Sequence, residues 1–401
     1  MTPSQPRRHA RPAQPPRRSV FLWIAPLAGA AAVLAAAGTL FFSSRTSADP
    51  AGAASPSARA SAGAIAAAGS SASDAIGIPD TSSAPPSPSS SPSSAPGRTP
   101  DTTGPFPFGL LIADRGNGRI LAVNNAGHVV WRFPVKGSLP AGVPFAADDA
   151  FVSPDGKTIV ANDEYHQVIY RIDIKTRKVI WRYGHFGVPG PGDGYLHNPD
   201  DAYPLANGDI VVADIVNCRI LQIAPDKHIV RTLGVAGSCT DNAPHTYGDP
   251  NGDTPLPDGG LLITEIHGSR VVRLSPTGRV LFDFHVPVAY PSDAQIDSRG
   301  EVIVVDYSNP GSVVAMSQKG KLLWRWGPTS GPSRMDHPSL GTPLPNGDIV
   351  INDDARDRII VVDPRSGRIV WQYGHTDRAG TAAGYLSDPD GHQPIPANAP
   401  F

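Results

Sequence analysis

The stretch that decides the fold is NPDDAYPLANGDIVVAD, residues 198–214. An Asn-Gly pair, Asn207 and Gly208, divides it into a polar half and a β-branched apolar half. Such a pair suits a two-residue hairpin turn in which both residues take a positive φ. The apolar half, Ile210 to Val212, is typical of a strand that is buried on both faces. The stretch therefore predicts two antiparallel strands joined by a tight turn.

The same cycle recurs three more times along the chain. Each copy has a Gly nine residues after a Pro, which we call the repeat Pro, as Gly208 follows Pro199. The repeat Pro of the other three copies stands at residues 250, 291 and 338. A second hairpin then begins with an Arg five residues beyond the closing acid and ends in an aromatic residue. The acid–Arg pairs are Asp114–Arg119, Asp214–Arg219, Glu265–Arg270 and Asp353–Arg358. Four antiparallel strands per unit are typical of a propeller blade.

The recurring pairs and aromatic residues are interpreted as structural. We expect the acid–Arg pairs to tie neighbouring blades, because a residue type repeated in several blades more often supports the fold than binds a ligand. The aromatic positions should pack between blades. They are Trp131, Trp181, Phe282, Trp324 and Trp371.

The two ends of the repeat region set the number of units at six. The first unit begins at Phe106 with a second-strand sequence, residues 109–114, and lacks an inner strand. The tail YLSDPDGHQPIP at residues 385–396 matches YLHNPDDAYPLA at residues 195–206. The C-terminal strand should therefore complete the first blade, since a closed ring has no exposed sheet edges at the join. We predict an all-β, six-bladed β-propeller with four antiparallel strands per blade over residues 106–401.

The residues before the propeller have a different composition. Residues 1–19 contain five Arg and no acid, and the 23 residues from 20 to 42 carry no charge. Such a segment is long enough to cross a bilayer as a helix, and its basic flank should stay in the cytoplasm. We expect a single-pass signal anchor at 20–42 in the cell membrane, with the propeller on the extracytoplasmic side. A cleaved signal peptide, or a twin-arginine export signal at Arg17 and Arg18, is the alternative.

The segment from 43 to 105 is rich in small residues and proline. Ser, Ala and Pro fill 41 of the 58 positions between 43 and 100. We expect a disordered linker, because the segment lacks the apolar side chains that offset the entropy of ordering. The remainder of the chain has 26 basic and 32 acidic residues, and this acidic balance disfavours nucleic acid as a partner.

The repeats resemble those of known propeller families. The Gly-rich connector, the inner-strand Pro and the Asp-x-x-x-x-Arg-Ile element look like NHL repeats, which form six-bladed propellers in extracellular sensors and some enzymes. Residues 173–181 and 363–371 resemble the Asp-Gly-Trp repeats of quinoprotein-like (PQQ-like) propellers. Enzymes of that group usually have more blades, so six blades count against a bound quinone. Exported arylsulfotransferase-like propellers are relatives in fold, and a fold alone does not assign a function.

Inner strands line the axis of a propeller, so the aligned repeats predict which side chains face the central channel. The acids at these positions are Asp148, Asp149, Asp200, Asp201, Asp293 and Asp390. Converging carboxylates suit a hard cation such as Ca²⁺. The alternative is a local structural role, since Asp before a strand also caps turns. Asp253 and His392 come from opposite blades, and face to face across the axis they would suit acid–base chemistry or metal ligation.

Histidines in the connectors between blades add to the candidate site. The catalytic candidates are His392, Asp253, His197 and His337, all predicted on the face that carries the acids. Two long connectors share a Tyr-Gly-His start and a Gly-Tyr-Leu end, and loops of this kind often contact ligands. The predicted ligand-binding residues are His185, His375, Tyr195 and Tyr385. No two His stand at helical metal-ligand spacing, so the sequence has no zinc signature.

The chain has two cysteines, Cys218 and Cys239. One falls in the turn between the second and third strands of the third blade, and the other falls in the connector that leaves this blade. An exported location favours a disulfide between them, and two free thiols are the alternative.

These patterns predict a membrane-tethered, extracytoplasmic module that binds or senses a protein, peptide or glycan through its acidic face. The alternative is an exported propeller enzyme that uses Asp and His at the channel. It would be a metal-dependent hydrolase or lyase, or an arylsulfotransferase-like enzyme; quinone-linked oxidation is more distant. The lack of a nucleophile elbow or phosphate loop favours binding. The clustering of His and Asp favours an enzyme.

Overall fold

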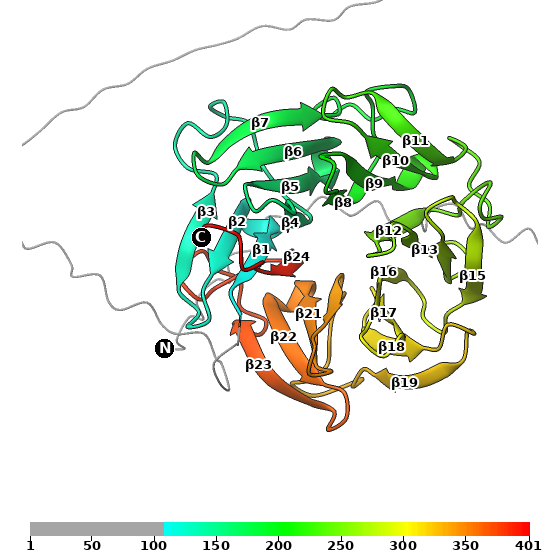
Figure 1. Ribbon diagram of the computed structural model, residues 1–401. Coiled ribbons are helices and arrows are strands. Elements are labelled where there is room, and N and C mark those ends of the chain that lie inside the picture. Colours follow the sequence, from blue (N-terminus) through cyan, green and yellow to red (C-terminus); the bar gives the residue numbers. More distant parts are fainter. Residues whose placement is uncertain (1–107) are drawn as a thin grey trace, which may run out of the picture. The chain divides into compact units, whose positions relative to one another are not determined.

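The computed structural model describes residues 108–401, which form six four-stranded antiparallel sheets (Figure 1). The sheets lie side by side around a central axis, so the prediction of a six-bladed propeller is confirmed. The predicted basic tail (1–19), membrane segment (20–42) and linker (43–105) precede this part of the chain, and all three lie outside the described residues. Within residues 108–401, no helix combines the length and apolar character needed to cross a membrane.

Each of the first three blades runs from an inner strand at the axis to an outer strand at the rim. Blade 1 consists of β24 (Pro389–Pro394), β1 (Leu110–Asp114), β2 (Arg119–Val123) and β3 (Val129–Phe133). Blade 2 consists of β4 (Ala150–Val152), β5 (Thr158–Asp163), β6 (Val168–Asp173) and β7 (Lys178–Tyr183). Blade 3 consists of β8 (Pro199–Pro204), β9 (Ile210–Asp214), β10 (Arg219–Ile223) and β11 (Ile229–Gly234).

The last three blades repeat this order. Blade 4 consists of β12 (Pro250–Pro255), β13 (Leu261–Glu265), β14 (Arg270–Leu274) and β15 (Val280–His285). Blade 5 consists of β16 (Pro291–Ile296), β17 (Val302–Asp306), β18 (Ser312–Met316) and β19 (Leu322–Trp326). Blade 6 consists of β20 (Gly341–Pro343), β21 (Ile349–Asp353), β22 (Arg358–Asp363) and β23 (Arg368–Gly374).

Single turns of 3₁₀ helix join the second and third strands of four blades. They are η2 (Arg115–Asn117), η3 (Glu164–His166), η4 (Ile215–Asn217) and η5 (Asp354–Arg356), in blades 1, 2, 3 and 6. These turns lie at the end of the strands where each inner strand begins, so they surround the same face of the propeller. We call this face the channel mouth.

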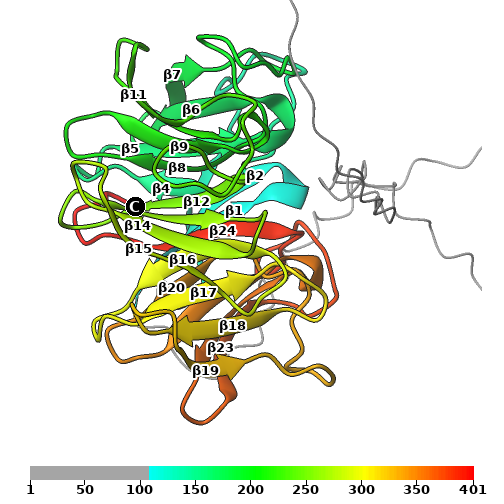
Figure 2. The ribbon, with the colours of Figure 1, turned by 90° about the vertical axis from the view of Figure 1, so that its right-hand side faces the viewer.

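The ring is closed by the C-terminal strand. β24 pairs antiparallel with β1, with Ile112 opposite His392 and Leu110 opposite Pro394. Figure 2 shows the red β24 beside the cyan β1. The two strands are separated by almost the whole described chain, and this pairing confirms that the tail supplies the missing inner strand of the first blade.

The hairpin turns differ from the prediction in one detail. Gly208 has a φ of 90°, whereas Asn207 is not among the residues with positive φ. The Leu205 N–H donates to the Asp209 carbonyl and the Gly208 N–H donates to the Leu205 carbonyl. The loop therefore has three residues, 206–208, with Gly in the left-handed position. The expectation of two positive-φ residues was wrong, because Gly208 alone supplies the left-handed conformation that the longer loop requires.

Three of the four acid–Arg pairs hold their blade to the connector that enters it, and Glu265–Arg270 is the exception. Asp214 Oδ2 accepts from Arg219 Nε at 2.7 Å, and Asp214 Oδ1 accepts from the His197 N–H at 2.6 Å. The guanidinium of Arg219 also donates to the carbonyls of Pro191 and Tyr195. Since Asp214 and Arg219 face one another on β9 and β10, the pair itself lies within one blade. The three pairs therefore fasten connectors to blades, where the sequence suggested direct ties between blades.

Six hydrophobic clusters fill the spaces between neighbouring blades, which we call seams. Phe133 of blade 1 and Tyr170 of blade 2, for example, belong to one cluster of buried side chains. The outer-strand tryptophans close these seams, as predicted. Trp131 Nε1 donates to the Ile174 carbonyl of the next blade at 2.8 Å, and Trp181 Nε1 donates to the Pro225 carbonyl at 2.8 Å.

Candidate functional site

Bulges in the inner strands allow consecutive acids to approach the axis. The register of β8 against β9 shifts between Asp200 and Tyr203, and φ at Asp201 is 48°. A bulge adds a residue to one strand and re-aims its side chains. Asp200 and Asp201 are consequently both buried, and both repel Asp149 of the neighbouring blade.

Seven buried acids gather around the channel mouth, and we call them the axial carboxylates. They are Asp148, Asp149, Asp200, Asp201, Asp253, Asp293 and Asp390. They include the six predicted metal ligands. Asp148, Asp149 and Asp200 come closest together, with carboxylate oxygens that all lie within 4.8 Å of one another. Calcium–oxygen bonds are about 2.3–2.6 Å, so three oxygens at this separation can share one cation.

Burial and mutual repulsion raise the pKa values of four of these acids, Asp149, Asp200, Asp201 and Asp253. Burial is the main cause for Asp149, whose pKa rises to about 8, and Asp148 adds repulsion. Burial also raises the pKa of Asp200 and of Asp201 well above the usual range, and neighbouring carboxylates add to both effects. The negative charge is therefore costly here unless a proton or a cation neutralises it.

Two of the axial carboxylates have oxygens without hydrogen-bond partners in the described part of the chain. Both oxygens of Asp253 and the Oδ2 of Asp201 are buried and unpartnered there, and Asp253 is 0% exposed. Asp293 differs, because Thr254 and Gln295 donate to it at 3.1 to 3.3 Å. Burial raises the pKa of Asp293 to about 6, and these hydrogen bonds limit the rise. Unpartnered buried carboxylate oxygens are rare in folded proteins and suit a cation as the missing partner.

A positive charge lies among these acids, and the sequence interpretation missed it. Arg115 is buried, forms ion pairs with Asp148 and Asp390, and donates to Asp388 at 2.9 and 3.1 Å. Its position directly after the acid of the first acid–Arg pair places it in η2, at the channel mouth. Aligning that position across the blades would have identified it. One guanidinium compensates only part of the charge of seven carboxylates.

The space between the axial carboxylates is small. Its free volume is about 10 Å³, and its lining includes Asp149, Asp200, Asp201 and Asp293 together with polar Asn251 and Ser292. About 10–15 Å³ is the room that one water molecule needs, so the space suits a single small ion and excludes a larger ligand. The oxygen-rich lining fits a hard cation, which would be held by Asp148, Asp149 and Asp200 and partnered by nearby Asp201.

In the structure, no hydrogen bond links Asp253 and His392, so the predicted pair is not formed. His392 is 1% exposed, and its Nδ1 contacts Asn352 Oδ1 on β21 of blade 6. Among residues 108–401, no hydrogen bond reaches His392 Nε2 or either Asp253 oxygen. Burial lowers the pKa of His392 to about 3, so the imidazole is neutral at physiological pH. His392 thus lacks the acid–base pairing on which its candidacy depended.

The other two catalytic candidates lie in connectors at the channel mouth. The backbone N–H of His197 donates to Asp214, and burial lowers the pKa of its imidazole. His337 Nδ1 lies 2.6 Å from Asp336 Oδ1, and its ring lies 4.9 Å from that of Tyr307. Neither contact brings these rings to the three closest axial carboxylates. Their catalytic role stays a prediction.

The four predicted ligand-binding residues form two close ring pairs, of which His185–Tyr195 is stacked and His375–Tyr385 is tilted. The His185 and Tyr195 rings lie 4.0 Å apart, and the His375 and Tyr385 rings lie 4.1 Å apart. Each pair joins the start of a long connector to its end. Arg119 and Arg219 donate to the carbonyls of Tyr385 and Tyr195, so both connectors are fastened to the following blade. The two connectors therefore have similar geometry, and both lie on the channel-mouth face.

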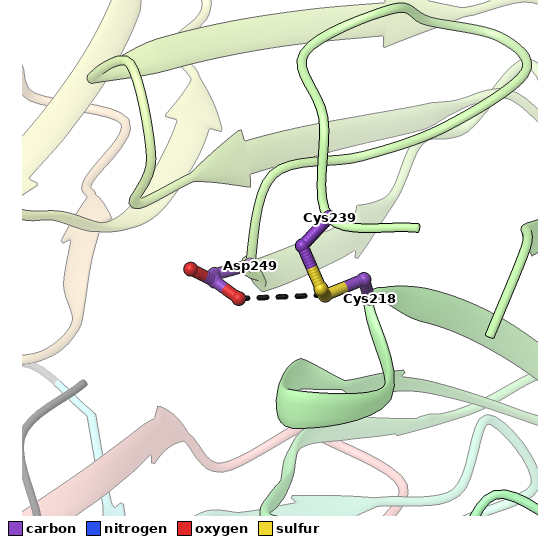
Figure 3. A group of neighbouring side chains, drawn as sticks. All are labelled: Cys218, Cys239 and Asp249. Carbon is purple, nitrogen blue, oxygen red and sulfur yellow. Dashed lines mark hydrogen bonds between the residues drawn. A yellow bond between two sulfur atoms is a disulfide. The ribbon is translucent and has the colours of Figure 1, made fainter. Parts of the chain in front are cut away.

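Cys218 and Cys239 form a disulfide with a Cα–Cα distance of 5.2 Å, and Asp249 lies beside it (Figure 3). Asp249 Oδ1 is 3.4 Å from Cys218 Sγ. Cys218 is fully buried at the end of η4. The bond fastens the connector between blades 3 and 4 to the channel-mouth face. A disulfide sulfur is a poor metal ligand, so this group differs in chemistry from the axial carboxylates.

Comparison with known proteins places the chain in a family. Residues 165–392 match the family described as outer membrane protein assembly factor BamB, and the chain belongs to this family of PQQ-like propellers. The match begins in η3 and ends in β24, so it covers most of the blades. The predicted resemblance to PQQ-like repeats is confirmed.

Individual relatives are more distant. A probable peptidyl-alpha-hydroxyglycine alpha-amidating lyase of Caenorhabditis elegans is 27% identical over 155 residues, which are 37% of this chain and 43% of that protein. The alignment thus spans less than half of the relative. A Bacteroides caccae protein of unknown function has a similar fold, with a TM-score of 0.53 and 17% identity over 72% of this chain and 99% of that one. A streptogramin B lyase structure gives a TM-score of 0.48, with 16% identity over 71% of this chain and 86% of that one.

Proposed function

We propose that this protein is an extracytoplasmic binding propeller, tethered to the membrane by residues 20–42, whose channel mouth holds a divalent cation such as Ca²⁺. The observation that carries the proposal is the surplus of buried negative charge. Asp148, Asp149 and Asp200 have oxygens within 4.8 Å of one another, and Arg115 compensates only part of the charge around them. A hard cation supplies the positive charge and the oxygen coordination that this arrangement lacks.

The cation would hold the blades together and shape the face around it. Asp148 and Asp149 belong to the start of blade 2, and Asp200 belongs to blade 3, so one ion would crosslink two blades. The free space among the acids is about 10 Å³, which leaves no room there for a peptide or glycan. Such a ligand would lie above the ion, against the two long connectors that carry His185–Tyr195 and His375–Tyr385.

A propeller enzyme of the lyase type is the second candidate. The observation that favours it is the 27% identity to a probable amidating lyase over 155 residues. In this case the axial carboxylates and Arg115 would be the reactive or substrate-orienting groups. His392 is a poor candidate for proton transfer, because burial lowers its pKa to about 3 and Asn352 occupies its Nδ1.

The test is a metal titration of the purified full-length chain. We expect bound metal by elemental analysis, and a melting temperature that falls with chelator and recovers with Ca²⁺. Asp149→Asn and Asp200→Asn should abolish the Ca²⁺-dependent shift, because each removes one of the three converging carboxylates. Asp226→Asn is the matched control, since the Asp226 side chain is 73% exposed and pairs with the exposed His228. No bound metal and no Ca²⁺-dependent shift would refute the cation site.

The enzyme is tested separately with a peptidyl-α-hydroxyglycine, the substrate class named for the nematode relative. Glyoxylate release that disappears in Arg115→Lys and Asp200→Asn would favour the lyase. Binding of Ca²⁺ without glyoxylate release would favour the binding module.

A further inference from the structure

The outer strands of five blades carry two aromatic residues, two positions apart. The pairs are Trp131–Phe133, Trp181–Tyr183, Phe282–Phe284, Trp324–Trp326 and Trp371–Tyr373. In four of these pairs the two rings lie 5.0 to 6.4 Å apart and nearly parallel. These rings pack against the hydrophobic clusters that fill the seams. Aromatic rings are therefore the usual filling of a seam in this propeller.

Blade 3 is the exception among the six described outer strands. β11 has Arg231 and Leu233 at the two aromatic positions. The Arg231 side chain points toward the next blade, as the indoles of the outer strands β3 and β7 do. Its Nη1 donates to the Pro276 carbonyl of blade 4 at 3.5 Å. In the same way, Trp181 Nε1 donates to the Pro225 carbonyl of blade 3 at 2.8 Å. The hydrogen bond of the seam is thus kept in a weaker form, but β11 contributes no ring. The aromatic residue of the hydrophobic cluster at this seam is Tyr247, which comes from the connector after β11 and does not line the pocket described next.

A pocket of about 120 Å³ lies at this seam. Its apolar walls are Leu205, Val211, Ile220, Leu233, Leu256 and Leu261, from both blades. These side chains include the edge of the hydrophobic cluster between blades 3 and 4. The pocket opens near the turns that join inner and second strands, at the opposite end of the strands from the channel mouth. It is therefore separate from the axial carboxylates.

The polar side of the pocket is cationic. Arg231 and Gln222 line it, and Gln222 Nε2 donates to Asp209 at 2.6 Å. Arg231 is partly buried, and within residues 108–401 it takes part in no ion pair. A guanidinium at the rim of an apolar pocket suits a carboxylate, which it can bind through two parallel hydrogen bonds.

From these observations we infer that the seam between blades 3 and 4 is a binding site for a small aromatic carboxylate. The ring takes the place of the outer-strand aromatic pair that the other five blades have and β11 lacks, and the carboxylate pairs with Arg231. The size is suitable, since an apolar cavity of about 150 Å³ binds benzene. The polar rim and apolar walls are the arrangement expected of a small-molecule site.

The experiment uses benzoate as the probe and benzamide as its neutral isostere, with the full-length chain. We expect saturable binding of benzoate by ligand-detected NMR and calorimetry. Arg231→Leu keeps the pocket apolar and removes the charge, so benzoate should bind about tenfold more weakly while benzamide binding stays unchanged. Arg182→Leu is the matched control, because Arg182 is an exposed arginine on the outer strand β7. It should leave benzoate binding unchanged.

A second variant, Arg231→Trp, restores the residue found at this position in four other blades. It should fill the pocket, abolish binding of both probes and raise the melting temperature by about 2 °C. The inference is overturned if benzoate shows no saturable binding to the unaltered protein, or if Arg231→Leu binds benzoate as tightly as the unaltered protein does. Unchanged benzoate binding by Arg231→Trp would also overturn it.

Discussion

Two sets of buried carboxylates in this propeller have opposite electrostatic surroundings. Three of the four acids of the acid–Arg pairs, Asp114, Asp214 and Asp353, are each met by a guanidinium and a backbone amide. Asp353, for example, is met by Arg358 at 2.7 Å and by the Asp336 N–H at 2.7 Å. The axial carboxylates share one guanidinium, and Asp253 has two oxygens that no described residue contacts by a hydrogen bond. Both sets are buried to a similar degree, so burial does not distinguish a structural acid from a functional one. What distinguishes the two kinds of acid is whether a guanidinium and an amide contact the carboxylate.

The largest expected effect comes from breaking a compensated pair. Arg358→Ala leaves Asp353 buried without its counter-charge, and the free energy of unfolding should fall by about 3–5 kcal/mol. Both side chains are at most 2% exposed, so water cannot replace the guanidinium. Urea denaturation of the full-length chain measures the change.

The control is Arg365→Ala, whose side chain is 69% exposed and pairs with Asp363. It should change stability by less than about 1 kcal/mol, as expected for a surface ion pair. Equal losses for the two variants would show that the buried pair has no special role.

A substitution among the axial carboxylates should have the opposite effect on stability. Asp253→Asn removes a buried acid whose oxygens have no hydrogen-bond partner in residues 108–401, so the melting temperature without metal should rise by about 2 °C. In the presence of Ca²⁺ the gain should shrink, because the unaltered protein then has its cation. Thermal melts with chelator and with Ca²⁺ measure both values. A lower melting temperature in chelator would mean that Asp253 is compensated like Asp353.

A further test concerns a residue between the two sets. Glu265 belongs to an acid–Arg pair, yet Arg270 Nε is 3.7 Å away and the Arg270 guanidinium also pairs with Asp283. Burial raises the pKa of Glu265 to about 8, while the unfolded chain releases this proton near pH 4.5. The contribution of Glu265 to stability is therefore full below pH 4.5 and is lost as the pH rises toward 8.

Glu265→Gln stays neutral and should remove this part of the pH dependence. The melting temperature of the variant, relative to that of the unaltered protein, should increase between about pH 5 and pH 8. Melts at these two pH values measure the difference. A constant difference would place Glu265 with the fully compensated acids.

Much of the fold could be predicted because it follows from local, repeated patterns. The nine-residue spacing from Pro to Gly and the tail that matches residues 195–206 predicted the blade, the count and the closure. The three-residue loop at 206–208 was missed, because an Asn-Gly pair fits both a two-residue and a three-residue hairpin loop. The register in which the two strands pair decides between the two loops. The contact partners of the acid–Arg pairs were missed, because they depend on which connector lies beside each guanidinium in the folded chain.

The candidate site was predicted in composition but not in arrangement. Alignment of inner strands identified the acids, but it also paired Asp253 with His392, whose ring instead contacts Asn352 of an adjacent blade. Arg115 was overlooked because it lies in a turn rather than on an inner strand. Distances across a ring depend on how six blades pack, and no single repeat contains that information.

The sequence by itself determined the six repeats, the closing strand and the acids of the inner strands, because each follows from residue type and spacing within one blade. The tertiary structure decided which acids are neutralised, which histidine is buried and which seam has an open pocket. These features arise between blades, where burial sets the cost of a charge and neighbouring side chains determine whether that charge has a partner.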